Sequence, residues 1–510
     1  MTGAVNPATS LNAGRRAREL NELGRSVVDV LVVGGGVTGA GVALDAASRG
    51  LSVVLAEKHD LAFGTSRWSS KLVHGGLRYL ASGAVGIAHE SAVERGILMT
   101  RTAPHLVRAL PQVVPLLPGI SRAHGVLVRA GFAAGDALRL AAGTPGSVLP
   151  RSRRITAAEV RRYAPTVASD GLRGALLAWD GQLADDARLV IAIARTAAGL
   201  GARILTRCAA LEVTGHGAVL RDELTGSQID VAARTVVNAA GVWAGEVDPT
   251  VRLRPSRGTH LVLSQAAFGG LSAGLTVPVP GSTSRFVFAL PAPDERVYVG
   301  LTDEDAPGPV PDVPSASEGE IDFLLAVIGS ALRAPLTRAD LLGSFAGLRP
   351  LLDSGGADTA DLSRRHAVLT RPDGLVTVVG GKLTTYRRMA QDAVDTAVAR
   401  AGLAAGLCVT RRLPLVGATG ADRVAASDRL VGRYGAEAVH VQAAAGGDPA
   451  LLRPVCAGVR TSGAELVFAV RHEGALDVGD LLDRRTRVGL DPAARAAALP
   501  AAHAALAAAP

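Results

Sequence analysis

Residues 27–39 read VVDVLVVGGGVTG, an apolar run followed by closely spaced glycines. A short continuous apolar run of this kind predicts a buried parallel strand. Gly34, Gly36 and Gly39 fit the pattern G-x-G-x-x-G, which permits a tight turn, lets backbone approach a pyrophosphate and packs a helix closely on the strand. Helical spacing continues through Ala47, so the segment predicts the first strand and helix of a dinucleotide-binding unit.

The next apolar run strengthens this interpretation. Residues 51–56 predict a second strand, and Glu57 follows it directly. A carboxylate about 20 residues beyond such glycines can bind a ribose 2′-hydroxyl. The glycine pattern alone is a weak signal, because glycine-rich turns occur in unrelated sheets. Strand, turn, helix and Glu57 together predict a doubly wound α/β fold.

The rest of the chain alternates between helical and strand patterns. We expect a helix near 186–199 and an apolar strand over 235–241. Alternation at 285–290 and 296–300 predicts antiparallel strands with one exposed or cavity-facing side, which suits a substrate domain.

The C-terminal part begins with a third apolar strand. Residues 375–379 predict that strand, which leads into two glycines and a helix ending near 401. Residues 405–510 look mainly helical and end in an Ala-rich tail, which we expect to be frayed or loosely packed.

The segment after Glu57 is far more specific than the glycine pattern. Residues 64–80 read GTSRWSSKLVHGGLRYL, with many hydroxyls, glycines and cations that suit a long phosphate-bearing cofactor. The segment resembles the signature T-S-x-x-S-S-K-L-x-H-G-G-L-R-Y-L of FAD-dependent glycerol-3-phosphate dehydrogenases. The resemblance implies FAD as the cofactor. It implies cofactor contacts from Thr65, Ser66, Ser70, Lys71, His74 and Gly75.

Further blocks resemble the same family, in the family's order, over roughly residues 29–490. These blocks lie at 185–189, 238–243, 258–260, 300–303, 347–350 and 380–386. The resemblance implies a split FAD-binding doubly wound domain, an inserted antiparallel-sheet substrate domain and a helical C-terminal domain. The predicted boundaries are 1–28 for an N-terminal arm, 29–115, 166–250 and 346–404 for the FAD-binding domain, 116–165 for an insertion without assigned role, 251–345 for the substrate domain and 405–510 for the C-terminal domain.

Oxidation of a secondary alcohol by a flavin needs a base, a cation for developing alkoxide charge and a clamp that fixes the carbon over the ring. A substrate phosphate suits arginine, whose planar fork donates two hydrogen bonds. By resemblance Arg78, Arg349 and Arg364 are the candidates, with a hydroxyl from Tyr79. The family often has an acid after the last of these arginines, whereas this chain reads SRRH, so Arg365 stays an alternative.

A lysine follows two glycines at the start of the last predicted helix of the FAD-binding domain. Lys382 could reach flavin or substrate, and free backbone donors at a helix start could stabilise negative charge on the reduced flavin. We therefore treat Lys382 as a catalytic and substrate-binding candidate. The resemblance adds Ala240, Gly381, Leu383 and Thr384 as cofactor contacts.

Two histidines are candidates for the base. An unperturbed histidine titrates near pH 6.5, so either could accept a proton at neutral pH. We favour His260, because the inserted sheet should face the substrate, and expect His74 to contact the cofactor. Water or an arginine-polarised hydroxyl stays an alternative.

The composition limits the classes of molecule that the protein is expected to bind. The formal net charge of +8 is compatible with a phosphorylated substrate or an anionic membrane surface. Only 3% of the residues are aromatic, so a stacking surface for nucleic acid is not expected. Cys208, Cys408 and Cys456 lack metal-ligand spacing, and no metal site is expected.

Targeting signals are not evident either. No apolar stretch has the roughly 18–20 residues of a membrane helix, and no secretion signal is apparent. We expect a cytoplasmic protein with peripheral contact to the membrane's cytoplasmic face. The weakly amphipathic arm 1–28 is interpreted as a solvated segment or as a contact with anionic lipid.

The favoured function is oxidation of sn-glycerol 3-phosphate to dihydroxyacetone phosphate, with electrons passed from FAD to a quinone. The alternatives are an oxidase that uses oxygen, a related flavin amine or amino-acid oxidase, and a non-catalytic FAD-binding, membrane-associated protein. A homo-oligomer is compatible with the sequence.

Overall fold

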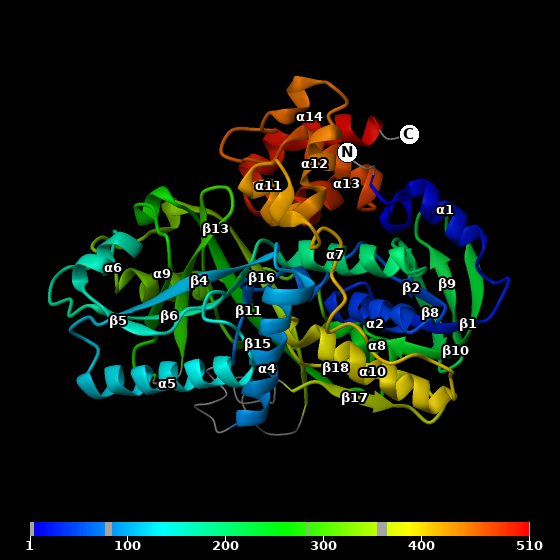
Figure 1. The fold of residues 1–510 in the computed structure, drawn as a ribbon, viewed down its shortest axis with the longest axis horizontal. Helices are drawn as coiled ribbons and strands as arrows, with labels where there is room; N and C mark the ends of the chain where they lie inside the picture. Colours follow the sequence, from blue (N-terminus) through cyan, green and yellow to red (C-terminus); the bar gives the residue numbers. More distant parts are fainter. Residues whose placement is uncertain (1–4, 77–83, 283–284, 354–364, 509–510) are drawn as a thin grey trace.

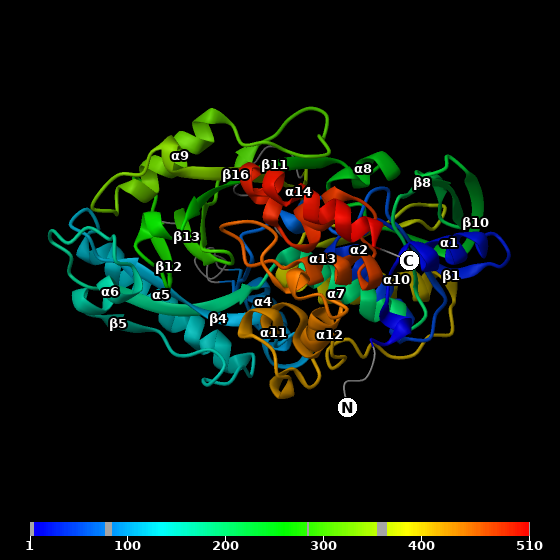
Figure 2. The same cartoon turned by 90° about the horizontal axis from the view of Figure 1, so that it is seen from above.

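A computed structural model describes residues 5–76, 84–282, 285–353 and 365–508. Two β-sheets stand beside each other, and the C-terminal helices lie above the helix α7 between them (Figures 1 and 2). Arg122 and His124 are described in their backbone only.

The first sheet carries the dinucleotide-binding strands. Its order is β17-β18-β10-β1-β2-β7, with β8 and β9 attached to β10. The five strands from β18 to β7 are parallel, as the apolar runs predict, and β17 pairs antiparallel at the edge. The bounds are β1 Val28–Val33, β2 Val53–Ala56, β7 Arg203–Leu205, β8 Cys208–Thr214, β9 Gly217–Asp222, β10 Gln228–Asn238, β17 Ala367–Thr370 and β18 Val376–Val379.

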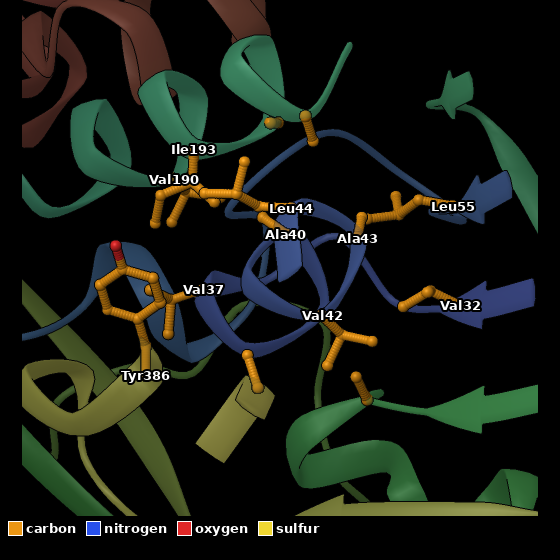
Figure 3. Close-up of a cluster of buried hydrophobic side chains, with 14 of the residues drawn as sticks. Val32, Val37, Ala40, Val42, Ala43, Leu44, Leu55, Val190, Ile193 and Tyr386 are labelled. Atoms are coloured by element: carbon orange, nitrogen blue, oxygen red, sulfur yellow. The ribbon is translucent and has the colours of Figure 1, made fainter. Parts of the chain in front are cut away.

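Helix α2 (Val37–Ser48) packs against α7 (Asp186–Gly199) and α10 (Tyr386–Ala401). Figure 3 shows side chains of all three helices meeting in one buried cluster beside β1 and β2. In this cluster the three helices contribute mostly small and aliphatic side chains, together with Tyr386 and Met389 of α10. This packing fixes the start of α2, where the glycine turn lies.

The second sheet is larger and mostly antiparallel. Its order is β15-β11-β14-β13-β12-β4-β6-β3, with β16 paired to β11 and β5 paired to β6. The bounds are β3 Leu72–Val73, β4 Val107–Pro115, β5 Arg153–Ile155, β6 Ala175–Leu183, β11 Leu253–Ser264, β12 Gly274–Pro278, β13 Phe286–Ala292, β14 Arg296–Gly300, β15 Glu304–Asp305 and β16 Leu341–Leu352. Helix α9 (Glu318–Gly329) packs on β11, β12, β13 and β14.

Strands β4 and β6 belong to a different sheet from the one that the predicted domain boundaries imply. Both strands were expected in the FAD-binding domain, yet they pair with each other along their whole length and β4 continues the pairing to β12. Their hydrogen bonds therefore place them in the second sheet. The insertion 116–165 forms α5 (Arg122–Ala141), β5 and α6 (Ala157–Tyr163) beside these strands, and helix α4 (Val85–Ile97) contacts α5.

The expectation of a solvated N-terminal arm is wrong. Helix α1 (Ala13–Asn21) packs on the first sheet, because Leu20 and Leu23 belong to a core cluster with β1. Arg16 forms an ion pair with Asp222. The described part of the arm is thus packed against the rest of the chain through residues 16–23.

The C-terminal region is helical, as expected, with α11 (Asp428–Tyr434), α12 (Ala438–Ala443), α13 (Gly463–His472) and α14 (Pro492–Ala507). The expectation of a frayed tail is wrong. Helix α14 buries Ala494, Ala498, Ala502 and Ala505 in a cluster shared with α13. We refer to residues 408–508 as the C-terminal domain. Within the described part of the chain, no helix combines the length and apolar character that crossing a bilayer requires.

Candidate active site

A cavity of about 1050 Å³ lies between the two sheets. Its volume is at the upper end of the roughly 300–1,000 Å³ usual for small-molecule sites, which suits a dinucleotide together with a substrate. Most predicted site residues line this cavity. They are Gly34, Gly36, Glu57, Thr65, Ser66, Ser70, His74, Ala240, Arg349, Gly381, Lys382, Leu383 and Thr384.

The glycine turn at the end of β1 forms one wall. Gly34 has φ +106°, and a Cβ there would lie 2.7 Å from the carbonyl oxygen of Ala239. A Cβ on Gly39, inside α2, would lie 1.8 Å from the carbonyl oxygen of Gly34. The first and third glycines are therefore sterically required, and Gly39 acts through packing because it does not line the cavity.

Glu57 follows β2 at the neighbouring strand end. Its Oε2 accepts a hydrogen bond from the Gly35 nitrogen at 2.6 Å, and Oε1 accepts one from the His59 nitrogen at 2.8 Å. Burial raises the pKa of this carboxyl, and the two backbone hydrogen bonds oppose that shift. The carboxyl is fixed at the cavity wall with lone pairs left for a ribose hydroxyl. Turn, helix start and carboxyl fit the adenosine half of FAD.

Residues 64–71, which we call the flavin loop, cross the cavity beside this turn. Ser66 Oγ accepts a hydrogen bond from the Val37 nitrogen at 2.9 Å, so the loop covers the start of α2. Thr65 Oγ donates to the Leu348 carbonyl at 2.6 Å, which joins the loop to β16. The loop thus links the glycine turn to the second sheet.

Lys71 was expected to contact the cofactor, but it does not line the cavity. Its Nζ lies 3.0 Å from Asp186 Oδ2 and donates to the carbonyls of Arg67 and Ser69. Burial lowers the pKa of Lys71 to about 8. The lysine therefore holds the loop from behind, and Asp186 is a partner that the spacing of residues did not indicate.

His74 lines the cavity directly after β3. Its Nδ1 lies 3.0 Å from Asp180 Oδ2, and the Arg95 guanidinium donates to Asp180 Oδ1 at 2.7 Å. Although burial opposes ionisation of Asp180, Arg95 and His74 hold the pKa of its carboxyl below the usual range. Gly75 is not at the cavity: its nitrogen donates to Asp180, and a Cβ there would meet Arg95 at 2.3 Å.

His260 lies one layer behind the cavity, on β11. The side chain is 1% exposed, and its ring stacks on Phe345 with 4.7 Å between centroids. Nε2 lies 2.8 Å from Ser70 Oγ, and Ser70 lines the cavity. Burial first, and then the charges of Lys71 and Arg349, lower the pKa of His260 well below 6.5. The ring is neutral at physiological pH and reaches the cavity through the Ser70 hydroxyl.

Two cations, Arg349 and Lys382, also line the cavity. Arg349 on β16 donates to Asp303 Oδ1 at 2.9 Å and to the Thr302 carbonyl at 2.9 Å. Lys382 Nζ donates to Ser91 Oγ on α4 at 2.8 Å. Lys382 precedes the short turn η7 (Leu383–Thr385) and α10, as the glycines before it predict. Asp303, which orients Arg349, falls in a block that resembles the family but was not singled out as a site residue.

Three predicted substrate contacts, Arg78, Tyr79 and Arg364, lie outside the described residues. The alternative Arg365 is described and exposed, and it is absent from the described cavity lining. Across the described ranges, no cluster of His, Cys, Asp and Glu side chains could hold a metal ion.

The proteins that this chain resembles agree with a cavity that fits FAD. Residues 29–387 match the family "FAD dependent oxidoreductase", and residues 408–509 match the "C-terminal domain of alpha-glycerophosphate oxidase". Glycerol-3-phosphate dehydrogenase 1 of Mycobacterium tuberculosis is 58% identical over 496 residues, covering 95% of this chain and 96% of the relative. Glycerol-3-phosphate dehydrogenase 2 of the same species is 37% identical over 511 residues, covering 95% and 85%.

A solved structure shares the complete fold. The glycerol-3-phosphate dehydrogenase of Bacillus halodurans, solved with FAD, superposes with a TM-score of 0.74 at 25% identity and covers 97% of this chain and 94% of its own. The match extends through both sheets and the C-terminal helices. This chain therefore belongs to the family of FAD-dependent glycerol-3-phosphate dehydrogenases.

Proposed function

We propose that the protein oxidises sn-glycerol 3-phosphate to dihydroxyacetone phosphate and that a quinone then takes the electrons. One observation carries the proposal: Ser70, Arg349 and Lys382 line the same cavity as the glycine turn and Glu57. A cofactor site and a polar, cationic pocket are thus continuous.

The phosphate of the substrate is assigned to Arg349. Its guanidinium is held by Asp303 and by the Thr302 carbonyl, which fixes its orientation before the substrate arrives. A planar fork held in this way suits bidentate phosphate binding. Arg78, Tyr79 and Arg364 stay predicted partners in the same role.

The substrate hydroxyl is assigned to the Ser70–His260 pair. Ser70 Oγ accepts the hydroxyl proton as it donates its own to His260 Nε2, so the proton ends on the buried ring. The lowered pKa of His260 makes it a weak base. The ring must therefore release the proton after each turnover before it can accept another. Lys382 lies on the cavity wall, where an ammonium stabilises alkoxide charge.

FAD, when bound, accepts the hydride that leaves the alcohol carbon. His74, Gly381, Leu383 and Thr384 line the part of the cavity assigned to the cofactor. The backbone donors at the start of η7 and α10 suit negative charge on the reduced ring.

An anaerobic mixing experiment tests the oxidation. Addition of glycerol 3-phosphate should bleach the flavin absorbance at once, whereas glycerol, which lacks the phosphate, should act far more slowly. Unchanged absorbance with glycerol 3-phosphate contradicts the proposed substrate. The reduced flavin is then reoxidised either under air or with a soluble quinone, and the yields of peroxide and quinol are compared. A stoichiometric yield of peroxide without reduction of the quinone contradicts the proposal that a quinone is the electron acceptor.

A quinone acceptor calls for contact with a membrane, and one exposed helix supports such contact. The outer face of α5 carries Val126 and Leu127, which are 69% and 59% exposed, and Leu140. Val85, at the start of α4, is also exposed. Co-sedimentation with anionic vesicles should fall when Val126→Glu and Leu127→Glu are combined. Equal sedimentation of this variant and the wild type contradicts the assignment of α5.

A further inference from the structure

The side chain of Arg487, in the C-terminal domain, ends on the flavin loop, 420 positions earlier in the chain. Its Nη2 donates to the Arg67 carbonyl at 2.5 Å, and its Cζ lies 5.0 Å from the centroid of the Trp68 ring. Arg487 is 3% exposed. Because an arginine buried in this way loses its hydration, its contacts with the loop replace the hydrogen bonds that water would make.

The same residue joins the loop to helix α7 and to the second sheet. Arg487 Nε lies 3.5 Å from Asp185 Oδ2 at the start of α7, and its own carbonyl accepts a hydrogen bond from Arg296 Nη1 on β14 at 3.0 Å. Arg487 Nη1 also donates to the Asp483 carbonyl at 2.8 Å, which anchors the side chain in its own domain. Arg487 therefore lies where the C-terminal domain, α7 and the second sheet meet.

A second contact fixes the segment that carries Arg487. Arg485 donates from Nη1 and Nη2 to the two carboxylate oxygens of Asp60 at 2.7 and 2.8 Å, and Arg484 Nε adds a bond of 2.5 Å. Asp60 is fully buried, and despite that burial the two guanidinium groups hold the pKa of its carboxyl far below the usual range. Paired buried charges of this kind specify a single geometry.

Arg487 contacts Arg67 and Trp68, next to the loop residues that face the cavity. Trp68, Ser69 and Ser70 all line it. Ser69 donates from its nitrogen and its Oγ to Asp186 Oδ2 at 2.9 and 2.8 Å. Asp186 thus holds the middle of the loop, while Arg487 holds the stretch just before it.

We propose that Arg487 is a positioning residue of the active site: it holds Arg67 and Trp68 so that Ser70 faces the substrate and meets His260. The effect on turnover rests on the proposed function, whereas the ordering of the loop does not. Through this side chain the C-terminal domain supports a cavity that is lined by residues from the rest of the chain.

The experiment compares three variants of the holoenzyme. Arg487→Ala removes the contacts with the loop, and Arg487→Lys keeps the charge but loses the planar fork. Arg495→Ala is the matched control, because Arg495 pairs with Asp483 in the same domain at 3.0 Å, and its described hydrogen bonds and ion pair do not involve the flavin loop. Hydrogen exchange of the peptide spanning residues 64–71 is followed by mass spectrometry, together with the dissociation constant of FAD, kcat and KM.

Arg487→Ala should speed exchange in residues 64–71 at least tenfold and lower kcat about tenfold or more, with a smaller change in KM. Arg487→Lys should lie between this variant and the wild type, and Arg495→Ala should match the wild type. Should Arg487→Ala fail to fold, Arg487→Lys decides by the same readings. The proposal is overturned if residues 64–71 of the folded Arg487 variants exchange hydrogen at the wild-type rate. It is also overturned if Arg495→Ala speeds this exchange as much as Arg487→Ala does. A wild-type protein inactive on glycerol 3-phosphate contradicts the proposed function alone, since exchange still reports the loop.

Discussion

His260 Nε2 and Ser70 Oγ lie 2.8 Å apart, and of the two side chains only that of Ser70 is among the described residues that line the cavity. The histidine is covered by Phe345 and by the strand β14, where a Cβ on Gly300 would lie 2.3 Å from the ring. In the proposed mechanism, the atom that meets the substrate, Ser70 Oγ, is therefore distinct from the atom that receives the proton, His260 Nε2.

Replacement of Ser70 by alanine should lower kcat by roughly 10²- to 10⁴-fold, the usual contribution of a positioned proton acceptor. His260→Gln should have a similar effect, and the double variant should add little because the two groups act as a unit. Steady-state kinetics and flavin content are the measurements. Near-wild-type kcat in either single variant would mean that the proton leaves by another route.

The pH dependence of kcat/KM gives a second test of the same pair. A base must be neutral to accept a proton, so activity falls as pH drops through its pKa. Because burial lowers the pKa of His260, the acid limb should lie well below pH 6.5. An acid limb at or above pH 6.5 would exclude His260 as the base.

Arg349→Lys keeps one charge but loses the bidentate fork. We expect kcat/KM for glycerol 3-phosphate to fall roughly ten- to a hundredfold, corresponding to about 1.5–3 kcal/mol for a charge-assisted contact. The preference over glycerol should shrink by the same factor, while FAD stays bound. If Arg349→Lys and Arg349→Ala both keep full flavin and an unchanged preference, the phosphate site lies elsewhere.

Gly39→Ala should abolish FAD binding, since the added Cβ would lie 1.8 Å from a backbone oxygen of the glycine turn. Gly131→Ala is the matched control: Gly131 lies within α5 and a Cβ there would meet nothing within 4 Å. The control should keep its flavin and gain about 0.5–1 kcal/mol of stability from helix propensity. Retention of flavin by Gly39→Ala, measured after gel filtration, would contradict the assigned turn.

Lys71→Met should destabilise the protein by about 3–5 kcal/mol, because Asp186 would be left as a buried carboxylate without its cation. Arg411→Met, at an exposed arginine that is not among the described lining residues of the cavity, should change stability by less than about 0.5 kcal/mol. Thermal unfolding of both variants in excess FAD measures the difference. Equal stability of the two would mean that Asp186 does not depend on Lys71.

The elements predicted most closely are those whose signal is local. The turn at Gly34, the carboxyl of Glu57 and the strand–glycine–helix segment around Lys382 follow from neighbouring residues, and each takes the expected place. Sheet membership is not local, because the partner of a strand such as β4 is chosen across the whole chain. Helix α14 has apolar small residues on every side, so its sequence shows no contrast from which the buried face could be predicted.

In the candidate active site, too, local features could be predicted and contacts between distant residues could not. The signature segment identified the flavin loop but not what holds it, since Lys71 pairs with a residue 115 positions away and Ser70 with one 190 positions away. His260 was predicted as a base facing the substrate, whereas the structure puts Ser70 between it and the cavity. The spacing of residues along the sequence does not predict that one side chain lies between another and the cavity.

The contacts of Asp60 with Arg485 and of Arg67 with Arg487 join residues 425 and 420 positions apart. During synthesis the ribosome releases the glycine turn and the flavin loop long before their partners. Until residues 480–487 have emerged, Asp60 is a carboxylate without its cations, and the loop lacks its contacts with Arg487. Assembly of the cofactor site is consequently a post-translational event, and a nascent chain stalled before residue 480 should bind FAD weakly even though every glycine of the turn is already present.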